Sequence, residues 1–175
     1  TDIQVSQFDP VHVNFITFIE NAADADVTGL EADMLYYPSD SLTISAAISL
    51  NDTEIVNDVA QTIPIVDIGN PLPLAPKRQG NVRIRKDLSS NQSYFQAAVK
   101  YASSTYNSFE AAKVLDQSAY TIVDFAYGLT INDVDVEFFI RNANDERANL
   151  YYNDQDDIPR ITTNRPRNMG VRLSY

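Results

Sequence analysis

Hydrophobic and polar residues alternate with a period of two along most of this chain. The pattern is clearest in Tyr120–Ile131, Val134–Arg141 and Asn168–Tyr175, where apolar side chains occupy every second position. A period of two indicates a β-strand whose two faces meet different environments. Four earlier segments alternate in the same way, and a fifth is rich in β-branched and aromatic residues; in chain order the five are Val11–Glu20, Asp26–Tyr37, Ser41–Leu50, Asn81–Lys86 and Tyr94–Tyr101. The sequence therefore predicts an all-β fold of about eight strands.

The connections between these strands alternate between short and long. After the polar break Asn21–Ala25 they are Pro38–Asp40, Asn51–Arg78, Asp87–Asn91, Ser103–Gln117, Asn132–Asp133 and Asn142–Asn164. An antiparallel up-and-down meander puts alternate connections at opposite ends, and bacterial outer-membrane barrels have short turns at one end and long loops at the other. A sandwich with Greek-key crossings gives no reason for such sorting. We expect a meander that is part of a transmembrane-type β-barrel, or that closes as one.

The alternation alone permits two environments for the apolar face. A soluble sandwich would turn that face inward, whereas a membrane barrel turns it toward lipid and keeps a wet interior. The predicted strands are long enough to cross the hydrocarbon when tilted, which favours the barrel. A soluble all-β binding or structural module with no transport role is the alternative.

Charge and composition narrow the range of functions. The net charge of -11 and the pI near 4.3 argue against nucleic acid as a partner, because phosphate binding requires a basic surface. The absence of cysteine excludes disulfides and thiolate metal sites. No run of apolar residues is long enough for a spanning helix. The chain opens at Thr1 within a pattern, with neither the basic region nor the apolar core of a signal peptide, and we expect this start to be a cut.

Several motifs resemble those of one family of membrane proteins. Asn21–Glu31 with Tyr37–Thr43, the Pro-rich Leu72–Lys77, and Val136–Glu146 are similar to the late barrel strands of TonB-dependent outer-membrane receptors. In the last of these the family usually has Leu where this chain has Ala143. The ending Arg165–Tyr175 resembles the family's final strand. The resemblance spans nearly all of the chain.

The resemblance implies an identity and a set of partners. Family members have a barrel of about twenty-two strands, an N-terminal plug and a box that engages TonB, and they import siderophores, vitamins, haem or oligosaccharides. Residues 1–175 would be the C-terminal barrel strands of such a receptor, located in the bacterial outer membrane, without the plug and the earlier strands. Lipid and the barrel assembly machinery would be direct partners, and the TonB complex a partner only through the missing plug.

The resemblance also suggests site residues. Four residues match the C-terminal signal that the assembly machinery reads: Asn168, Gly170, Leu173 and Tyr175. The long connections would be extracellular, and in the family such loops contribute to ligand capture. The candidates there are Tyr151, Tyr152, Asp154, Asp156 and Asp157, because tyrosine rings can stack on a ligand and carboxylates can bind its polar groups.

Structural explanations compete with each functional one. The acidic cluster of Asp145, Glu146 and the three loop aspartates lacks the spaced, glycine-containing loop of a known calcium site, so a solvated loop is favoured. His12 is the only histidine and has no cysteine beside it, which favours an ordinary strand residue. Asp133, Asp135 and Glu137 fit a wet lumen with Arg83, Arg141 or Arg172 as partners. No motif surrounds a serine nucleophile. We therefore predict no metal, no cofactor and no enzymatic activity.

Overall fold

A computed structural model describes residues 2–8, 17–58, 67–89, 92–108, 111, 114–153 and 160–175. Its strands are β1 (Asp2–Phe8), β2 (Thr17–Ser39), β3 (Leu42–Asp58), β4 (Arg78–Asp87), β5 (Tyr94–Ala102), β6 (Thr105–Tyr106), β7 (Asp116–Gln117), β8 (Tyr120–Ile131), β9 (Val134–Arg141), β10 (Asn149–Asn153), β11 (Arg160–Thr163) and β12 (Asn168–Ser174). Among these residues no helix is both long and apolar enough to cross a bilayer.

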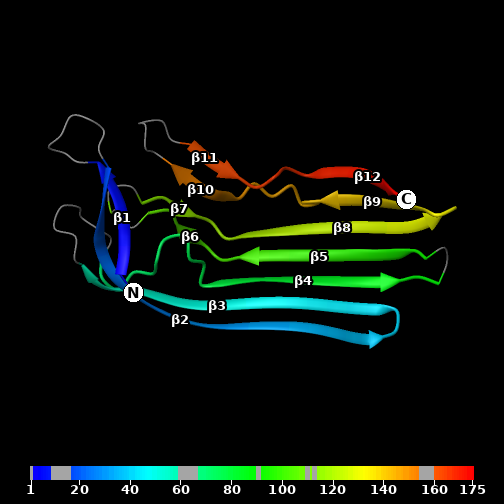
Figure 1. Cartoon of the computed structure of the whole chain (residues 1–175), viewed down its shortest axis with the longest axis horizontal. Coiled ribbons are helices and arrows are strands. Elements are labelled where there is room, and N and C mark those ends of the chain that lie inside the picture. The colour runs from blue at the N-terminus through cyan, green and yellow to red at the C-terminus, as the bar shows by residue number, and fades with distance from the viewer. Residues whose placement is uncertain are drawn as a thin grey trace.

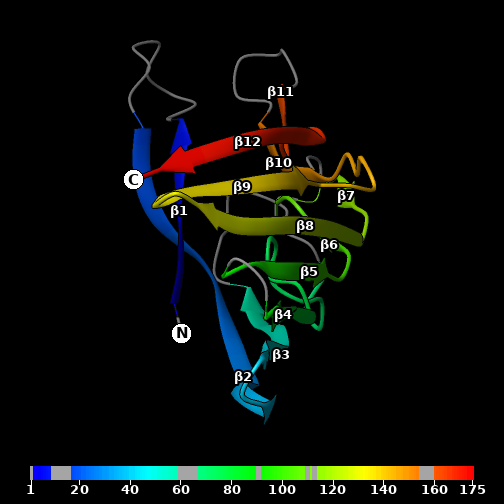
Figure 2. The same cartoon turned by 90° about the vertical axis from the view of Figure 1, so that its right-hand side faces the viewer.

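Eight strands form one antiparallel sheet in the order β1-β2-β3-β4-β5-β8-β9-β12 (Figure 1). Each strand pairs with its neighbours in sequence once the two-stranded hairpins β6–β7 and β10–β11 are set aside. The predicted antiparallel up-and-down meander of eight strands is confirmed. Seen nearly end-on, the sheet is a curved wall (Figure 2). Its first and last described strands do not pair with each other, so the wall does not close into a barrel.

Two strand boundaries near the N-terminus differ from the prediction. The expected break at Asn21–Ala25 is absent, because β2 runs without interruption from Thr17 to Ser39. A register shift against β3 between Asp24 and Ala25 absorbs the polar interruption instead, as β-bulges do. The other partner of this first part of β2 is β1, which was not predicted. Eight strands are present, but the first two are not the pair expected; Val11–Ile16 lies outside the described residues.

The long connections contain more structure than predicted. β3 continues to Asp58, eight residues beyond the expected end at Leu50. The connection after β5 contains the hairpin β6–β7, and the one after β9 contains β10–β11. In Figure 1 these hairpins and the described parts of the long connections lie at the left end of the sheet, and the turns β2–β3 and β8–β9 lie at the right end. The predicted sorting of short and long connections is therefore confirmed.

Cross-strand register joins the apolar positions of all the central strands into one face. One row across the sheet runs Met34, Ala46, Val82, Val99 and Val123, and another ends in Phe125, Ile140 and Met169. These side chains are not covered. Met34 is 51% exposed, Phe125 37% and Met169 66%. No second sheet covers this face among the described residues, so the soluble sandwich with packed apolar faces is not the architecture of this part of the chain.

Candidate functional site

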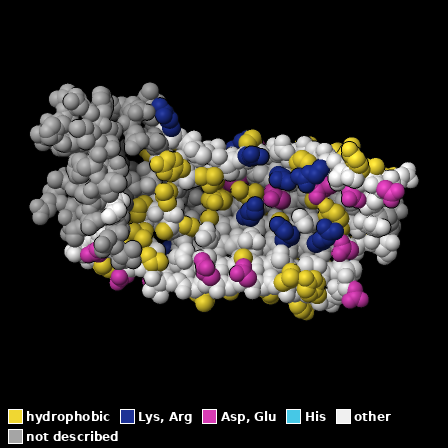
Figure 3. Space-filling view, in the orientation of Figure 1, with side chains coloured by type: hydrophobic (Ala, Val, Ile, Leu, Met, Phe, Trp, Pro, Cys, Tyr) yellow, Lys and Arg dark blue, Asp and Glu magenta, His cyan; other side chains and the backbone are white. Residues whose placement is uncertain are grey.

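The polar face of the wall carries the chain's candidate chemistry. Figure 3 shows basic side chains gathered over the middle of the sheet, with acidic side chains beside them. By register, Glu31 and Asp33 of β2 are paired with Ser49 and Ala47 of β3, which are paired in turn with Gln79 and Asn81 of β4. Arg83 and Arg85 follow Asn81 on the same face of β4. The net acidity of the chain is therefore not uniform on this face, because β2 contributes carboxylates and β4 contributes guanidinium groups.

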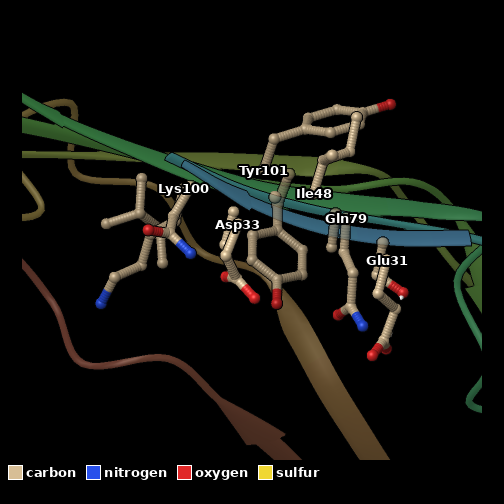
Figure 4. A pocket seen from close by; sticks show the side chains of 13 residues that line it. Glu31, Asp33, Ile48, Gln79, Lys100 and Tyr101 are labelled. Carbon is tan, nitrogen blue, oxygen red and sulfur yellow. Dashed lines mark hydrogen bonds between the residues drawn. The ribbon is translucent and has the colours of Figure 1, made fainter. Parts of the chain in front are cut away.

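A hollow of about 410 Å³ lies on this face where β2, β3, β4, β5 and β8 meet. Figure 4 shows Glu31, Asp33, Gln79 and Lys100 pointing to one side of the sheet, with Ile48 and Tyr101 pointing to the other. Two carboxylates, an amide and an ammonium group therefore share one polar surface. Such a set can bind polar ligand groups of either charge. The opposite apolar side has its own groove of about 560 Å³, formed by Met34, Ile48, Val82 and neighbouring residues.

A second polar cluster lies toward the short-turn end of the same face. The Tyr94 hydroxyl donates to Glu137 Oε2 at 2.6 Å, and Arg172 Nη1 donates to Glu137 Oε1 at 2.9 Å. The guanidinium of Arg85 stacks 3.6 Å from the centre of the Tyr94 ring and also pairs with Asp87 at 2.9 Å. Arg172 was one of the expected partners for the acidic face of β9. The cluster holds Tyr94 in one position from both sides.

Two glycines on this face lie beneath aromatic rings. Tyr94 lies directly opposite Gly128, and Phe139 lies directly opposite Gly170. A Cβ built on Gly170 would be 2.8 Å from the Phe139 ring, and one on Gly128 would overlap the Tyr94 ring. Arg141 and Arg172 approach the Phe139 ring at 5.3 and 5.9 Å. The rings thus occupy the space that a side chain would need at either glycine.

The segment after β9 is fixed by asparagine side chains. Asn142, only 4% exposed, donates from Nδ2 to the carbonyls of Glu146 and Arg165, both at 2.9 Å, and accepts from the Glu146 N–H at 2.9 Å. Asn164 accepts from the Ala148 N–H at 2.8 Å and donates to the Glu146 carbonyl at 3.0 Å. These bonds join the outgoing and returning ends of the β9–β12 connection. The Asn142–Glu146 stretch, singled out for its resemblance, therefore has a structural role.

Two further residues of this stretch attach it to its neighbours. Asn144 accepts from the Val123 N–H and donates to the Thr121 carbonyl, which links the connection to β8. Asp145 accepts from the Arg167 N–H at 3.0 Å and pairs with Arg147 at 3.2 Å. The Arg167 N–H bond, with attraction from Arg147 and Arg167, holds the pKa of Asp145 below its usual value. The acidic cluster expected here is thus partly neutralised by arginine.

The Pro-rich segment is also held in place. Leu72 N–H donates to Thr53 Oγ1 at 2.9 Å, and Leu74 N–H donates to the Tyr106 carbonyl at 2.8 Å. The Tyr106 hydroxyl donates back to the Pro71 carbonyl. Burial raises the pKa of the Tyr106 phenol above its usual value. This segment therefore bridges β3 and the β6–β7 hairpin.

The predicted loop candidates are only partly described. Tyr151, 46% exposed, and the partly exposed Tyr152 lie in β10, paired with Thr162 and Ile161 of β11. Asp154, Asp156 and Asp157 lie outside the described residues, as does His12. Among the described residues no three His, Cys, Asp or Glu side chains are grouped to hold a metal ion. Ligand binding by the loop candidates remains a prediction.

The predicted assembly residues lie on the last described strand. Asn168 begins β12 opposite Arg141, and Gly170 lies under Phe139. Leu173 is exposed and Tyr175 is fully accessible near the short-turn end. Sequence reasoning did not find Thr105 and Gln117, which face each other in the small hairpin β6–β7. A two-residue strand has no periodic signal that could have indicated them.

The sheet and its sorted connections can be compared with known proteins. Residues 1–143 match the family model for the TonB dependent receptor-like β-barrel. The chain belongs to the TonB-dependent receptor family. No curated protein matches it in sequence. Barrels of this family lie in the bacterial outer membrane. The apolar face of this TonB-dependent receptor barrel is therefore the lipid side, and the polar face with its hollow is the interior side.

Solved structures support the same fold. The siderophore receptor PiuA from Acinetobacter baumannii matches with a TM-score of 0.74 and 21% identity, over 98% of this chain and 23% of its own. The ferric yersiniabactin uptake receptor FyuA from Yersinia pestis matches with a TM-score of 0.74 and 18% identity, over 89% and 24%. The ferric-catecholate import receptor Fiu from E. coli K12 has a TM-score of 0.71 and 14% identity, over 96% and 22%. The chain spans about a quarter of the length of these receptors.

Proposed function

We propose that residues 1–175 are the C-terminal part of the barrel wall of a receptor that imports a scarce nutrient across the outer membrane. The observation that supports this most is the continuous, uncovered apolar face backed by a polar face. In lipid such a face needs no second layer of protein, whereas in water it would favour association. The role is transport, not catalysis, and the nutrient class is a siderophore, vitamin, haem or oligosaccharide.

The loop end of the wall supports a part in ligand capture. Asn142, Asn164 and the Pro-rich segment hold the connections in defined positions, so side chains on them can be preorganised for a ligand. Tyr151 and Tyr152 are the proposed ligand contacts within the described residues, with Asp154, Asp156 and Asp157 beside them in sequence. The barrel assembly machinery is the proposed partner of Asn168, Gly170, Leu173 and Tyr175, and TonB would act through a plug elsewhere in the receptor.

The orientation of the two faces can be tested directly because the chain contains no tryptophan. Val82→Trp places a single fluorophore on the apolar face, and Arg83→Trp places one on the polar face of the same strand. In vesicles containing phosphatidylcholine with brominated acyl chains, we expect strong quenching of the first and little of the second. Equal quenching of both, or a chain that stays soluble and unquenched without detergent, would favour the soluble module.

The complete gene provides a second test. The proposal expects a signal peptide, a TonB-engaging segment, a plug and about fourteen further alternating strands upstream. A start codon immediately before Thr1, or a signal peptide joined directly to it, would contradict the receptor. If the gene is complete, its deletion should abolish growth on one limiting nutrient from a panel of ferric siderophores, haem, cobalamin and oligosaccharides.

A further inference from the structure

A separate cavity of about 260 Å³ lies at the loop end of the wall. It is formed by the ends of β4, β5 and β8, the hairpin β6–β7, the Pro-rich segment and the start of β10. It borders the larger hollow on the polar face, because both are lined by Gln79, Ala102 and Tyr120. Unlike that hollow, which includes Glu31, Asp33 and Lys100, this cavity has no charged side chain in its lining.

Two polar atoms of residues that line the cavity have no hydrogen-bond partner among the residues that the structure describes. Gln117 is only 3% exposed, and its Nε2 finds no acceptor in the described structure; Thr105 Oγ1 is likewise buried and unsatisfied there. The two residues are directly opposite each other in the hairpin β6–β7, and both line the cavity. Directly opposed residues of an antiparallel pair share a face. Both side chains therefore line the same space, with the unsatisfied nitrogen and oxygen buried at its wall.

Such groups are costly when they remain unpaired. A buried donor without an acceptor costs about 1–3 kcal/mol, and nearly all buried polar groups in native proteins have a partner. The neighbouring Tyr106 shows how the same hairpin meets this demand elsewhere, since its hydroxyl reaches the Pro71 carbonyl. Gln117 and Thr105 therefore have hydrogen-bonding capacity that protein atoms do not use.

The lining defines the chemistry of a ligand that would use this capacity. Leu74, Pro76 and Leu150 supply apolar surface, while Gln117, Asn149 and Tyr120 supply amide and phenol groups. An ionic ligand group would lose its hydration here without a counter-charge. A sugar ring has hydroxyls that both donate and accept, as amides do, and apolar C–H faces for the leucine and proline side chains. We propose that this cavity binds a neutral sugar ring.

This inference deepens the proposed function, on which it rests, by giving one part of the imported ligand a chemical class. The test uses the complete protein that contains residues 1–175, purified in detergent and titrated with maltose and methyl glucoside by calorimetry. We expect measurable binding of these neutral sugars and none of glucuronate or glucosamine, which carry a charge on the same ring. Glucuronate or glucosamine binding as tightly as maltose would overturn the assignment.

Substitution of the unsatisfied donor provides the sharper experiment. Gln117→Leu keeps the approximate size and removes the donor, so maltose should bind about tenfold more weakly. The thermal unfolding midpoint of the variant should be unchanged or higher, because a buried unsatisfied group is lost. Gln96→Leu, on the polar face but away from the cavity, is the matched control and should leave maltose affinity unchanged.

Each remaining outcome decides the inference. If Gln117→Leu binds maltose as the wild-type chain does, or no neutral sugar binds, the cavity holds ordered water only and the inference fails. If Gln117→Leu does not fold, the side-chain amide NMR signal of Gln117 in the wild-type chain is measured instead, and it should shift on maltose addition. A signal that does not move would contradict the inference. If the chain binds no sugar but shows the face-specific lipid quenching, the proposed function still holds and only this inference fails.

Discussion

At the scale of single residues, the most informative feature is the pairing of glycine with an aromatic ring. Glycine in a strand exposes its backbone and provides no side chain to pack. Tyr94 covers Gly128 and Phe139 covers Gly170, so in each pair the ring supplies the contact that glycine lacks. Tyr94 is held more firmly, because Glu137 accepts from its hydroxyl and Arg85 lies over its ring. The two pairs should therefore respond differently to substitution.

Gly128→Ala should destabilise the fold by about 1–3 kcal/mol, as overpacking does, because the new methyl group displaces the Tyr94 ring from Glu137. In a Tyr94→Ala background, Gly128→Ala should instead stabilise the fold, since alanine is favoured over glycine in a strand interior by about 0.5–1 kcal/mol. Urea unfolding of the unsubstituted protein, the two single variants and the double variant in detergent measures both values. A loss of stability that is the same with and without Tyr94 would contradict the role assigned to the ring.

At the scale of elements, one charged residue, Asp145, adds to the contacts that hold the connection from β9 to β12. The folded-state pKa of Asp145 lies below its unfolded value, first because Arg167 N–H donates to it and then because of nearby arginines. The stability it contributes is therefore fully present above the unfolded pKa of about 3.9 and is lost as the pH falls through the lower, folded pKa.

We expect the NMR signals of the Arg167 amide to remain constant from neutral pH to about pH 4 and to shift only at lower pH. Asp145→Asn keeps an acceptor oxygen but has no carboxyl to titrate, so this acid shift should disappear in the variant. An Arg167 amide that shifts identically in both proteins would show that another group causes the change.

Elements also show what the sequence could and could not predict. The sequence predicted Tyr120–Ile131 and Val134–Arg141 to the residue, because the polar and apolar faces of these strands contrast strongly. In the structure, Asn132 and Asp133 between them adopt the left-handed φ of a tight hairpin turn. The polar run Asn21–Ala25 was misinterpreted as a break, because a bulge lets a strand continue through such a run. In the candidate site, the charged residues of the polar face followed from alternation. The unsatisfied state of Gln117 did not, because it depends on the packing of distant segments.

At the scale of the whole molecule, the sorting of connections predicts which end of the wall meets which compartment. Long connections lie at one end and short turns at the other (Figure 1). In outer-membrane barrels the long loops are extracellular and the short turns periplasmic. Because the chain has no cysteine, one introduced cysteine reports the position of each end.

Asp67→Cys places a thiol at the loop end, and Asp40→Cys places one in the β2–β3 turn; both positions are exposed. In intact bacteria that produce the complete protein, a membrane-impermeant maleimide should label the first variant nearly completely. The second should be labelled only after lysis, with the unsubstituted protein as the background. The reverse pattern would show that the short turns, and not the long connections, are extracellular. Labelling of both variants in intact cells would contradict insertion of the chain in the membrane.

The small hairpins at the loop end have a consequence for the order in which the wall forms. Strand β5 must find β8 across a long connection, and β9 must find β12 across a longer one. The chain entropy lost on joining two strands grows with the length of chain between them. The β6–β7 pairing of Thr105 and Gln117 brings the ends of the first connection together, and β10–β11 does the same for the second. We therefore expect each hairpin to lower the entropy cost of joining the two sheet strands on either side of it.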